Sequence, residues 1–219
     1  MGRFPQGIRG KGSQRWMQWL VNEAPDRLNE SLGLGPIDWR SPVRADDYAE
    51  YRDQGFLDLL GIDLQTRPLR TFWPLGGPQW DALGRAASGE VVLVEAKAHL
   101  NELYSPATGA SESSLMQIQS SLSEAALGLG VRPGYDWSKQ FYQYGNRLAH
   151  AYLLDQLNGV RTRLVFLYLI GDHDVKGPST RAEWETAIHT VHHTLGLSVA
   201  PAFVTDAFVD VRQCAVPTQ

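Results

Sequence analysis

The fold is decided by one stretch, Gln79-Trp80-Asp81-Ala82-Leu83-Gly84-Arg85-Ala86-Ala87-Ser88-Gly89-Glu90-Val91-Val92-Leu93-Val94-Glu95-Ala96-Lys97. The apolar, mostly β-branched run 91–94 predicts a buried strand. The small residues 87–89, which end in glycine, predict a three-residue hairpin loop that joins this strand to the one before it. Since alternate side chains of a strand share a face, Glu95 and Lys97 are expected to project together.

The hairpin loop also fixes the register of the two strands. A loop centred on Ser88 places Asp81 opposite Glu95, with Cβ atoms roughly 4.5–5.5 Å apart. Two carboxylates that close repel each other unless a cation lies between them. Mg²⁺ takes such oxygen ligands and keeps water molecules for a substrate phosphate, and Lys97 on the same face would stabilise developing negative charge. The hairpin therefore predicts a metal-dependent hydrolytic site.

Asp81, followed after a short apolar strand by Glu95-Ala96-Lys97, resembles the metal-site signature of the PD-(D/E)XK nuclease superfamily. The resemblance implies a restriction-endonuclease-like α/β fold, with an αβββαβ core and a mixed sheet flanked by helices. It also implies that Asp81, Glu95 and the backbone carbonyl of Ala96 bind Mg²⁺ or Mn²⁺, and that Lys97 assists the attacking water. Trp80 stands where the family pattern has proline.

A second motif follows on the helix predicted over Tyr135–Leu157. Gln140 and Tyr144 have the Q-x-x-x-Y spacing that resembles the helical motif of the RecB-like branch of the superfamily. Together with Gln143 and Arg147, they are expected to position the strand being cut. The polar residues predicted to form one stripe of this helix are Lys139, Gln143, Asn146, Arg147 and His150.

The resemblance also suggests that an acid of the first core helix joins the metal site, and Glu23 is the candidate. A solvent-facing glutamate is an equally good interpretation. Glu95 and Lys97 have an alternative too, as a surface ion pair of little energetic value, with Asp81 capping a turn. The 135–157 helix has the alternative of an ordinary amphipathic helix with one solvated face.

A different metal site is suggested by Asp172-His173-Asp174, three potential ligands in a row. Consecutive loop residues seldom converge on one ion, and we favour a turn capped by an aspartate. His189, His192 and His193 lie one helical turn apart without a further ligand, and are interpreted as a polar helix face.

Length and composition set the broad class. With 219 residues, of which 43% are hydrophobic, the chain suits a flexible N-terminus over 1–12 and a single nuclease-like domain over 13–219. A single cysteine excludes an internal disulfide and a cysteine-based zinc site. The N-terminus has no apolar signal segment, and the longest apolar run, Leu164–Ile170, is too short to cross a membrane. We therefore expect a cytoplasmic protein without membrane contact.

The net charge of −4 excludes binding to nucleic acid mainly by bulk electrostatic attraction. A carboxylate-rich metal site with a few local cations is compatible with this charge. We therefore expect a metal-dependent nuclease that hydrolyses phosphodiester bonds of DNA by a metal-activated water. The alternative is a catalytically inactive module on the same fold that binds nucleic acid or a protein partner. The sequence leaves the oligomeric state open.

The other predicted elements complete the αβββαβ order. Their ranges are a helix from Ser13 interrupted at Pro25, a charged surface helix over Val43–Leu60, a strand over Leu69–Trp73, a helix over Leu115–Leu127, a strand over Arg161–Ile170, a helix capped by Ser179 or Thr180 and running through Leu195, and a strand over Ala202–Val211.

Overall fold

The computed structural model describes residues 2–214 of the chain, and a five-stranded mixed sheet forms its centre. The strand order across the sheet is β2-β4-β5-β6-β7. Strand β4 is antiparallel to both of its neighbours, β2 and β5, whereas β6 and β7 continue the sheet in parallel with β5. The strands are β2 (Ile37–Ser41), β4 (Ala82–Ala86), β5 (Val91–Lys97), β6 (Thr162–Ile170) and β7 (Val204–Asp210).

The two parallel connections each pass through helices, as parallel strands require. Between β5 and β6 lie α5 (Glu112–Gly128), α6 (Tyr142–Tyr152) and a π-helical turn (Leu153–Leu157). Between β6 and β7 lies α7 (Arg181–Leu195), which begins with the predicted cap at Thr180. The predicted α/β class with a mixed sheet flanked by helices is confirmed.

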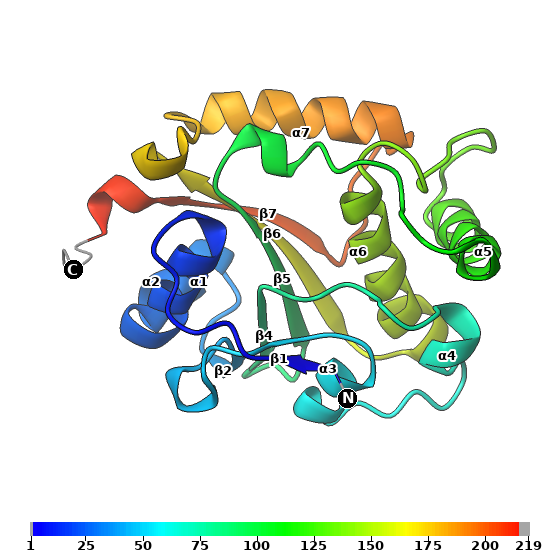
Figure 1. Ribbon diagram of the computed structural model, residues 1–219, viewed down its shortest axis with the longest axis horizontal. Helices are drawn as coiled ribbons and strands as arrows, with labels where there is room; N and C mark the ends of the chain where they lie inside the picture. Colours follow the sequence, from blue (N-terminus) through cyan, green and yellow to red (C-terminus); the bar gives the residue numbers. More distant parts are fainter. Residues whose placement is uncertain (1, 215–219) are drawn as a thin grey trace.

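Side chains of β5 alternate between two hydrophobic layers. Val92, Val94 and Ala96 pack on the side of α1 (Gly12–Glu23) and α2 (Pro25–Leu32), and the alternate residues of the strand face the opposite layer. Figure 1 shows these two helices, in blue, on one side of the sheet and α6 on the other. Because β5 is buried on both faces, its continuous apolar run is explained.

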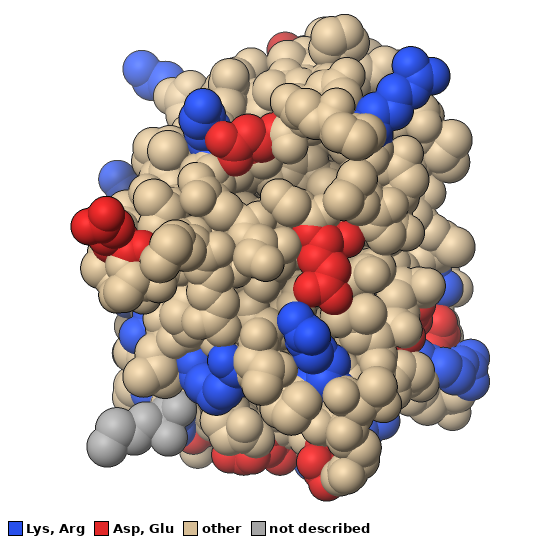
Figure 2. Space-filling view, turned by 90° about the vertical axis from the view of Figure 1, so that its right-hand side faces the viewer, with Lys and Arg blue, Asp and Glu red and all other residues tan. Residues whose placement is uncertain are grey.

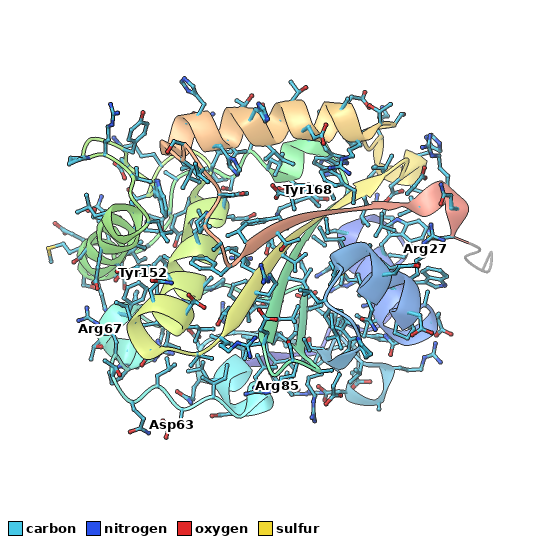
Figure 3. All side chains as sticks on the ribbon, turned by 180° about the vertical axis from the view of Figure 1, so that it is seen from behind. Arg27, Asp63, Arg67, Arg85, Tyr152 and Tyr168 are labelled. Carbon is cyan, nitrogen blue, oxygen red and sulfur yellow. The ribbon has the colours of Figure 1, made fainter. Side chains whose placement is uncertain are left out.

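The opposite layer is the larger one and contains α5, α6 and α7. Tyr144 of α6 stacks on Phe166 of β6, with ring centroids 3.9 Å apart. Tyr168 of β6 packs against Trp184 of α7, with centroids 5.1 Å apart, and Figure 3 shows Tyr168 beneath that helix. These aromatic contacts fix α6 and α7 over the sheet.

One predicted strand is wrong and one strand was missed. Residues Leu69–Phe72 form a single helical turn, α4, because the two buried residues of this segment are three positions apart and so share a helical face. The third antiparallel strand is instead β2, in which buried and exposed residues alternate over Ile37–Ser41.

The segment predicted as a charged surface helix over 43–60 has a more varied structure. It contains the strand β3 (Glu50–Tyr51) and the helix α3 (Gln54–Leu60), after a short 3-10 helix (Arg44–Asp46). Strand β3 pairs with β1 (Arg3–Phe4), so part of the segment expected to be flexible over 1–12 lies in a small second sheet. Met1 and residues 215–219, which belong to the predicted domain ranges, lie outside the described residues.

The remaining 3-10 helices are short connections, at Leu100–Glu102, His173–Val175 and Val211–Gln213. Among the residues that the structure describes, no helix is both long and apolar enough to cross a membrane.

Candidate functional site

The hairpin of β4 and β5 ends in an irregularity that places Asp81. The predicted register holds along the paired strands, where Ala82 lies opposite Val94. Asp81 departs from that register, because its backbone N–H donates to the carbonyl oxygen of Val94 at 3.1 Å. The carboxylate therefore does not simply face Glu95, and its Oδ2 accepts the backbone N–H of Ala96 at 2.7 Å.

The hydrogen bond from the N–H of Ala96 to Asp81 also indicates the direction of the Ala96 carbonyl. The N–H and C=O groups of one strand residue point to the same side, so the carbonyl of Ala96 points toward β4, as its N–H does. The β4 ladder has already ended at Ala82, and Ala96 lines a cavity at this point. The carbonyl oxygen of Ala96 therefore points toward this cavity.

Glu95 and Lys97 project from β5 on the α6 side, and their predicted common face is confirmed. Lys97 Nζ lies 2.6 Å from Glu95 Oε1 and donates to Oε1 of Gln143 at 3.2 Å. Both side chains are buried, with only 3% of Glu95 and 8% of Lys97 exposed. The interpretation as an exposed surface pair is therefore wrong.

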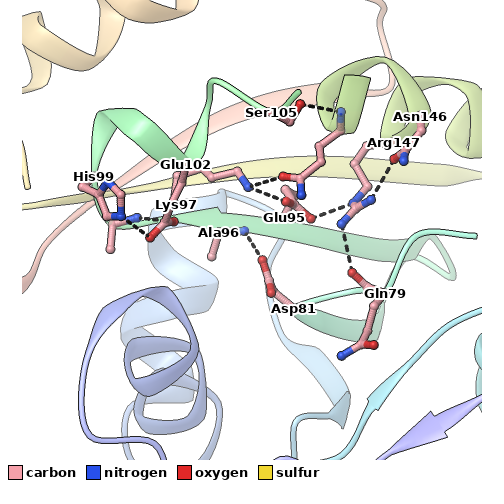
Figure 4. A network of polar contacts seen from close by, with 12 residues as sticks. Gln79, Asp81, Glu95, Ala96, Lys97, His99, Glu102, Ser105, Asn146 and Arg147 are labelled. Carbon is pink, nitrogen blue, oxygen red and sulfur yellow. Dashed lines mark hydrogen bonds and ion pairs between the residues drawn. The ribbon is translucent and has the colours of Figure 1, made fainter. Parts of the chain in front are cut away.

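Arg147 of α6 completes the network drawn in Figure 4. Its Nε lies 2.6 Å from Glu95 Oε2, and its Nη2 donates to the carbonyl oxygen of Gln79 at 3.0 Å. Its Nη1 donates to Oδ1 of Asn146 at 2.7 Å. Each carboxylate oxygen of Glu95 thus contacts one cation, Lys97 on one side and Arg147 on the other.

The two acids of the site have opposite pKa shifts. Burial alone would raise the pKa of Glu95, but the charges of Arg147 and Lys97 outweigh it and hold that pKa below its usual value. The pKa of Asp81 is raised well above its usual value by burial and by the negative charges of Glu95 and Glu50. Asp81 is the carboxylate that lacks a cation of its own.

Glu50 of β3 is a third acid of this region that the sequence analysis missed. It is 5% exposed, and its two oxygens accept from the side-chain amides of Gln14 at 2.9 Å and Gln79 at 2.6 Å. Burial raises the pKa of Glu50, and the charge of Glu95 adds to the increase. The sequence contains no local signal for its burial, because a glutamate between two apolar residues of a strand is expected to face solvent.

These residues surround a cavity of about 410 Å³. Its walls come from the start of α1, the end of β5, the segment 101–106 and the first two turns of α6. The lining residues are Ser13, Gln14, Asp81, Glu95, Ala96, Lys97, Asn101, Glu102, Tyr104, Ser105, Pro106, Gln143 and Arg147.

The donor set fits a hard divalent cation in part. Asp81 and the carbonyl of Ala96 would supply oxygen ligands, and Glu95 would supply another by releasing its contact with Lys97 or Arg147. Mg²⁺ accepts as few as one or two carboxylates because it keeps several waters. Within residues 2–214, no group of three or more His, Cys, Asp or Glu side chains is close enough to hold a metal ion. Any metal here would therefore depend on backbone, water and substrate oxygens as well.

Of the four predicted substrate-binding residues, the structure brings two to the cavity. Gln143 and Arg147 line it, whereas Gln140 precedes α6 and is exposed. Tyr144 points away from the cavity, since its hydroxyl lies 2.7 Å from Nε2 of His192. The predicted stripe fails at its start because Phe141 has a positive φ of 59°, so the helix begins only after it.

Glu23 is also placed elsewhere. It lies at the last residue of α1, whereas Ser13 and Gln14, which line the cavity, lie in the first turn. Its carboxylate pairs with Arg44 near the surface. The polar residue that α1 directs to the Glu50 side of the site is Gln14.

The Asp172-His173-Asp174 segment forms the capped turn that we favoured. The side chain of Asp172 accepts the backbone N–H of Asp174 at 3.2 Å and the indole N–H of Trp16 at 2.8 Å. Asp174 instead pairs with Arg15 at 2.9 Å. The two carboxylates thus have separate structural partners.

Comparisons of this chain with models of protein families, with curated proteins and with solved structures gave no match.

Proposed function

We propose that this chain is a Mg²⁺-dependent nuclease of the PD-(D/E)XK type, which hydrolyses phosphodiester bonds of DNA. One observation carries the proposal, namely that Asp81, Glu95, Ala96 and Lys97 all line one cavity at the end of the hairpin. The raised pKa of Asp81 adds to it, because a carboxylate repelled by two neighbouring acids is stabilised by a bound cation.

In this proposal, Asp81, Glu95 and the Ala96 carbonyl would hold Mg²⁺. When bound, the ion would polarise a phosphate oxygen and lower the pKa of a coordinated water. Lys97 would orient the attacking water and stabilise the charge that develops on the phosphoryl oxygens. Gln143, which accepts a hydrogen bond from Lys97, would hold the ammonium in place.

Arg147 would bind the phosphate next to the one that is cut. Its guanidinium is held by Glu95, by the carbonyl of Gln79 and by Asn146, so its planar donors are already ordered before substrate arrives. Arginine matches the geometry of phosphate oxygens with two parallel donors. The first turn of α1 borders the same cavity at Ser13 and Gln14, and its backbone N–H groups lack helical partners, which also favours an anion.

Contacts within the cavity, and not a broad basic surface, would supply most of the affinity. The chain has 20 Lys and Arg residues against 24 Asp and Glu residues. Figure 2 shows one face of the molecule, on which Lys and Arg side chains are scattered among Asp and Glu side chains and form no broad basic patch. Binding would therefore use few phosphate contacts and depend only moderately on salt.

Cleavage of single- and double-stranded DNA in Mg²⁺ or Mn²⁺ tests the proposal. We expect Lys97→Ala to reduce the rate by at least about 100-fold, as removal of a group that acts on the reacting atoms does. The matched control is Lys139→Ala, since Lys139 is an exposed lysine paired with Asp136 outside the cavity. Equal cleavage by Lys97→Ala and the wild type, with both proteins folded, would overturn the mechanism.

A second candidate function rests on the way Glu95 is bound. Both of its oxygens already contact cations at 2.6 Å, so the network is satisfied without a metal. A module that binds nucleic acid or a protein partner without turnover would retain such a network. If so, titration with Mg²⁺ by calorimetry would give no heat of binding, and DNA binding would be unaffected by Asp81→Asn.

A further inference from the structure

Tyr104 is an exposed aromatic side chain at the edge of the cavity. Among residues 2–214 it is the one aromatic residue that lines the cavity, and 50% of it is exposed. A tyrosine left half in solvent beside buried charged groups has an apolar face that a ligand can cover.

The segment that carries Tyr104 is fastened to the start of α6. The hydroxyl of Ser105, the next residue, accepts the backbone N–H of Gln143 at 2.8 Å, and its carbonyl oxygen accepts the N–H of Phe141 at 3.2 Å. The Tyr104 ring rests against the Phe141 ring, with centroids 5.2 Å apart and a tilt of 44°. The ring is therefore held in position before any ligand binds, which lowers the entropy that binding costs.

The cavity thus combines two kinds of wall. The lining includes the charged groups of Asp81, Glu95, Lys97 and Arg147, and it also includes the rings of Tyr104 and Pro106. Its volume of about 410 Å³ falls in the range of about 300–1,000 Å³ usual for small-molecule sites. A ligand that matches both walls carries a phosphate joined to a flat ring, as a nucleotide does.

We propose that Tyr104 stacks on an unpaired nucleobase next to the phosphate held by Lys97 and Arg147, so that the preferred substrate is single-stranded nucleic acid. The phosphate contacts rest on the function proposed above, whereas the stacking contact does not need turnover. In a duplex, each base is already stacked on its neighbours and must be unstacked before it reaches the ring. A single strand offers its bases freely, and every base has a face to stack.

Binding without cleavage tests this inference. The probe is a fluorescent 12-nucleotide single-stranded DNA in EDTA, followed by anisotropy, with a duplex and a single-stranded RNA of the same sequence as further probes. Loss of one stacked base costs roughly 5- to 150-fold in affinity. We expect that loss for Tyr104→Ala with single strands, and a change of less than about threefold for Tyr104→Phe, which keeps the ring.

The matched control is Tyr135→Ala, because Tyr135 is another tyrosine with 44% exposure and does not line the cavity. It should bind single strands as the wild type does. A DNA probe with abasic residues should bind the wild type and Tyr104→Ala alike, since the partner of the ring is then missing. Tyr104-dependent binding of single-stranded DNA or of single-stranded RNA supports the inference, and the two affinities show which nucleic acid is favoured.

Wild-type affinity in Tyr104→Ala, equal affinity for duplex and single strand, or no measurable binding of single strands would each overturn the inference. These outcomes are separate from those of the nuclease proposal. Cleavage that depends on Lys97 but not on Tyr104 would contradict the stacking inference and leave the nuclease proposal standing. Tyr104-dependent binding without any cleavage in Mg²⁺ would contradict the nuclease proposal and leave the stacking inference standing.

Discussion

Asp81 and Glu95 are both carboxylates of one small site, but their surroundings differ. Glu95 is buried between Lys97 and Arg147 and remains ionised, whereas Asp81 receives one backbone N–H and faces the charges of Glu95 and Glu50. The site thus contains a carboxylate whose charge is compensated by two cations, beside a carboxyl group whose ionised form is not compensated. In the proposed function, a cation bound at Asp81 would compensate the charge of its ionised form.

The raised pKa of Asp81 predicts how its replacement changes stability. The folded protein keeps the proton of Asp81 to a higher pH than the unfolded chain, in which an aspartate titrates near about 3.9. Stability therefore falls as the pH rises from about 4 through the raised pKa, and the ionised carboxylate costs free energy at neutral pH. We expect Asp81→Asn to be more stable than the wild type by about 0.5–2 kcal/mol at pH 7 in EDTA, the usual range for a stabilising substitution.

Urea unfolding at several pH values measures this difference, which should disappear below about pH 4. Asp136→Asn is the control, and we expect it to change the stability at pH 7 in the opposite direction, by lowering it. Hydrogen bonds from Ser138 lower the pKa of Asp136, so its contribution to stability is present at neutral pH and is lost as the pH falls. A less stable Asp81→Asn at pH 7 would contradict the account of Asp81.

At the scale of elements, the site exists because β5 extends beyond the end of β4. The last paired residues are Ala82 and Val94, and the remaining three residues of β5, 95–97, supply Glu95, the Ala96 carbonyl and Lys97. A single helix, α6, which is buried from Tyr144 to Tyr152, then adds Gln143 and Arg147 from the layer above. The geometry of the site thus depends on the register in which β4 and β5 pair.

Gly84 of β4 provides a test of that register. A Cβ at this position would lie 2.7 Å from Cγ2 of Ile37 and 3.1 Å from the ring of Trp39, both on β2. Overpacking of this kind typically costs about 1–3 kcal/mol. We expect Gly84→Ala to lose stability in that range, and to lose cleavage as β4 moves relative to β5.

Gly109→Ala is the matched control for Gly84→Ala. In the described part of the chain, no heavy atom lies within 4 Å of a Cβ added at Gly109. The free energy of unfolding of Gly109→Ala should therefore differ from that of the wild type by less than about 0.5 kcal/mol. Thermal unfolding and the DNA cleavage rate measure both variants. Wild-type stability and rate in Gly84→Ala would show that β2 does not constrain the hairpin.

At the scale of the whole molecule, the sequence predicts the centre of the sheet better than its margins. The hairpin, the common face of Glu95 and Lys97, β6, β7 and the capped start of α7 are correctly predicted. These features depend on local signals, namely a buried apolar run, a glycine turn and a capping residue. The mixed sheet follows from their order along the chain.

The rest depends on tertiary contacts that no local pattern encodes. Glu50 is buried because Gln14 and Gln79, which are distant in sequence, satisfy both of its oxygens. Gln140 and Tyr144 have the spacing of a motif, but the positive φ of Phe141 delays the start of α6. Strand β2 is the exception, because its sequence alternates apolar and polar residues over 37–40, which is a local signal for a strand.

The central claim is that Asp81, Glu95 and the carbonyl of Ala96 bind one divalent cation beside Lys97. A crystal structure of the wild type grown with Mn²⁺, with an anomalous difference map, tests it most directly. We predict a peak within bonding distance of Asp81, of Glu95 and of the Ala96 carbonyl oxygen. A map without that peak, in which Glu95 still contacts Lys97 and Arg147 and Asp81 contacts only the N–H of Ala96, would contradict the claim.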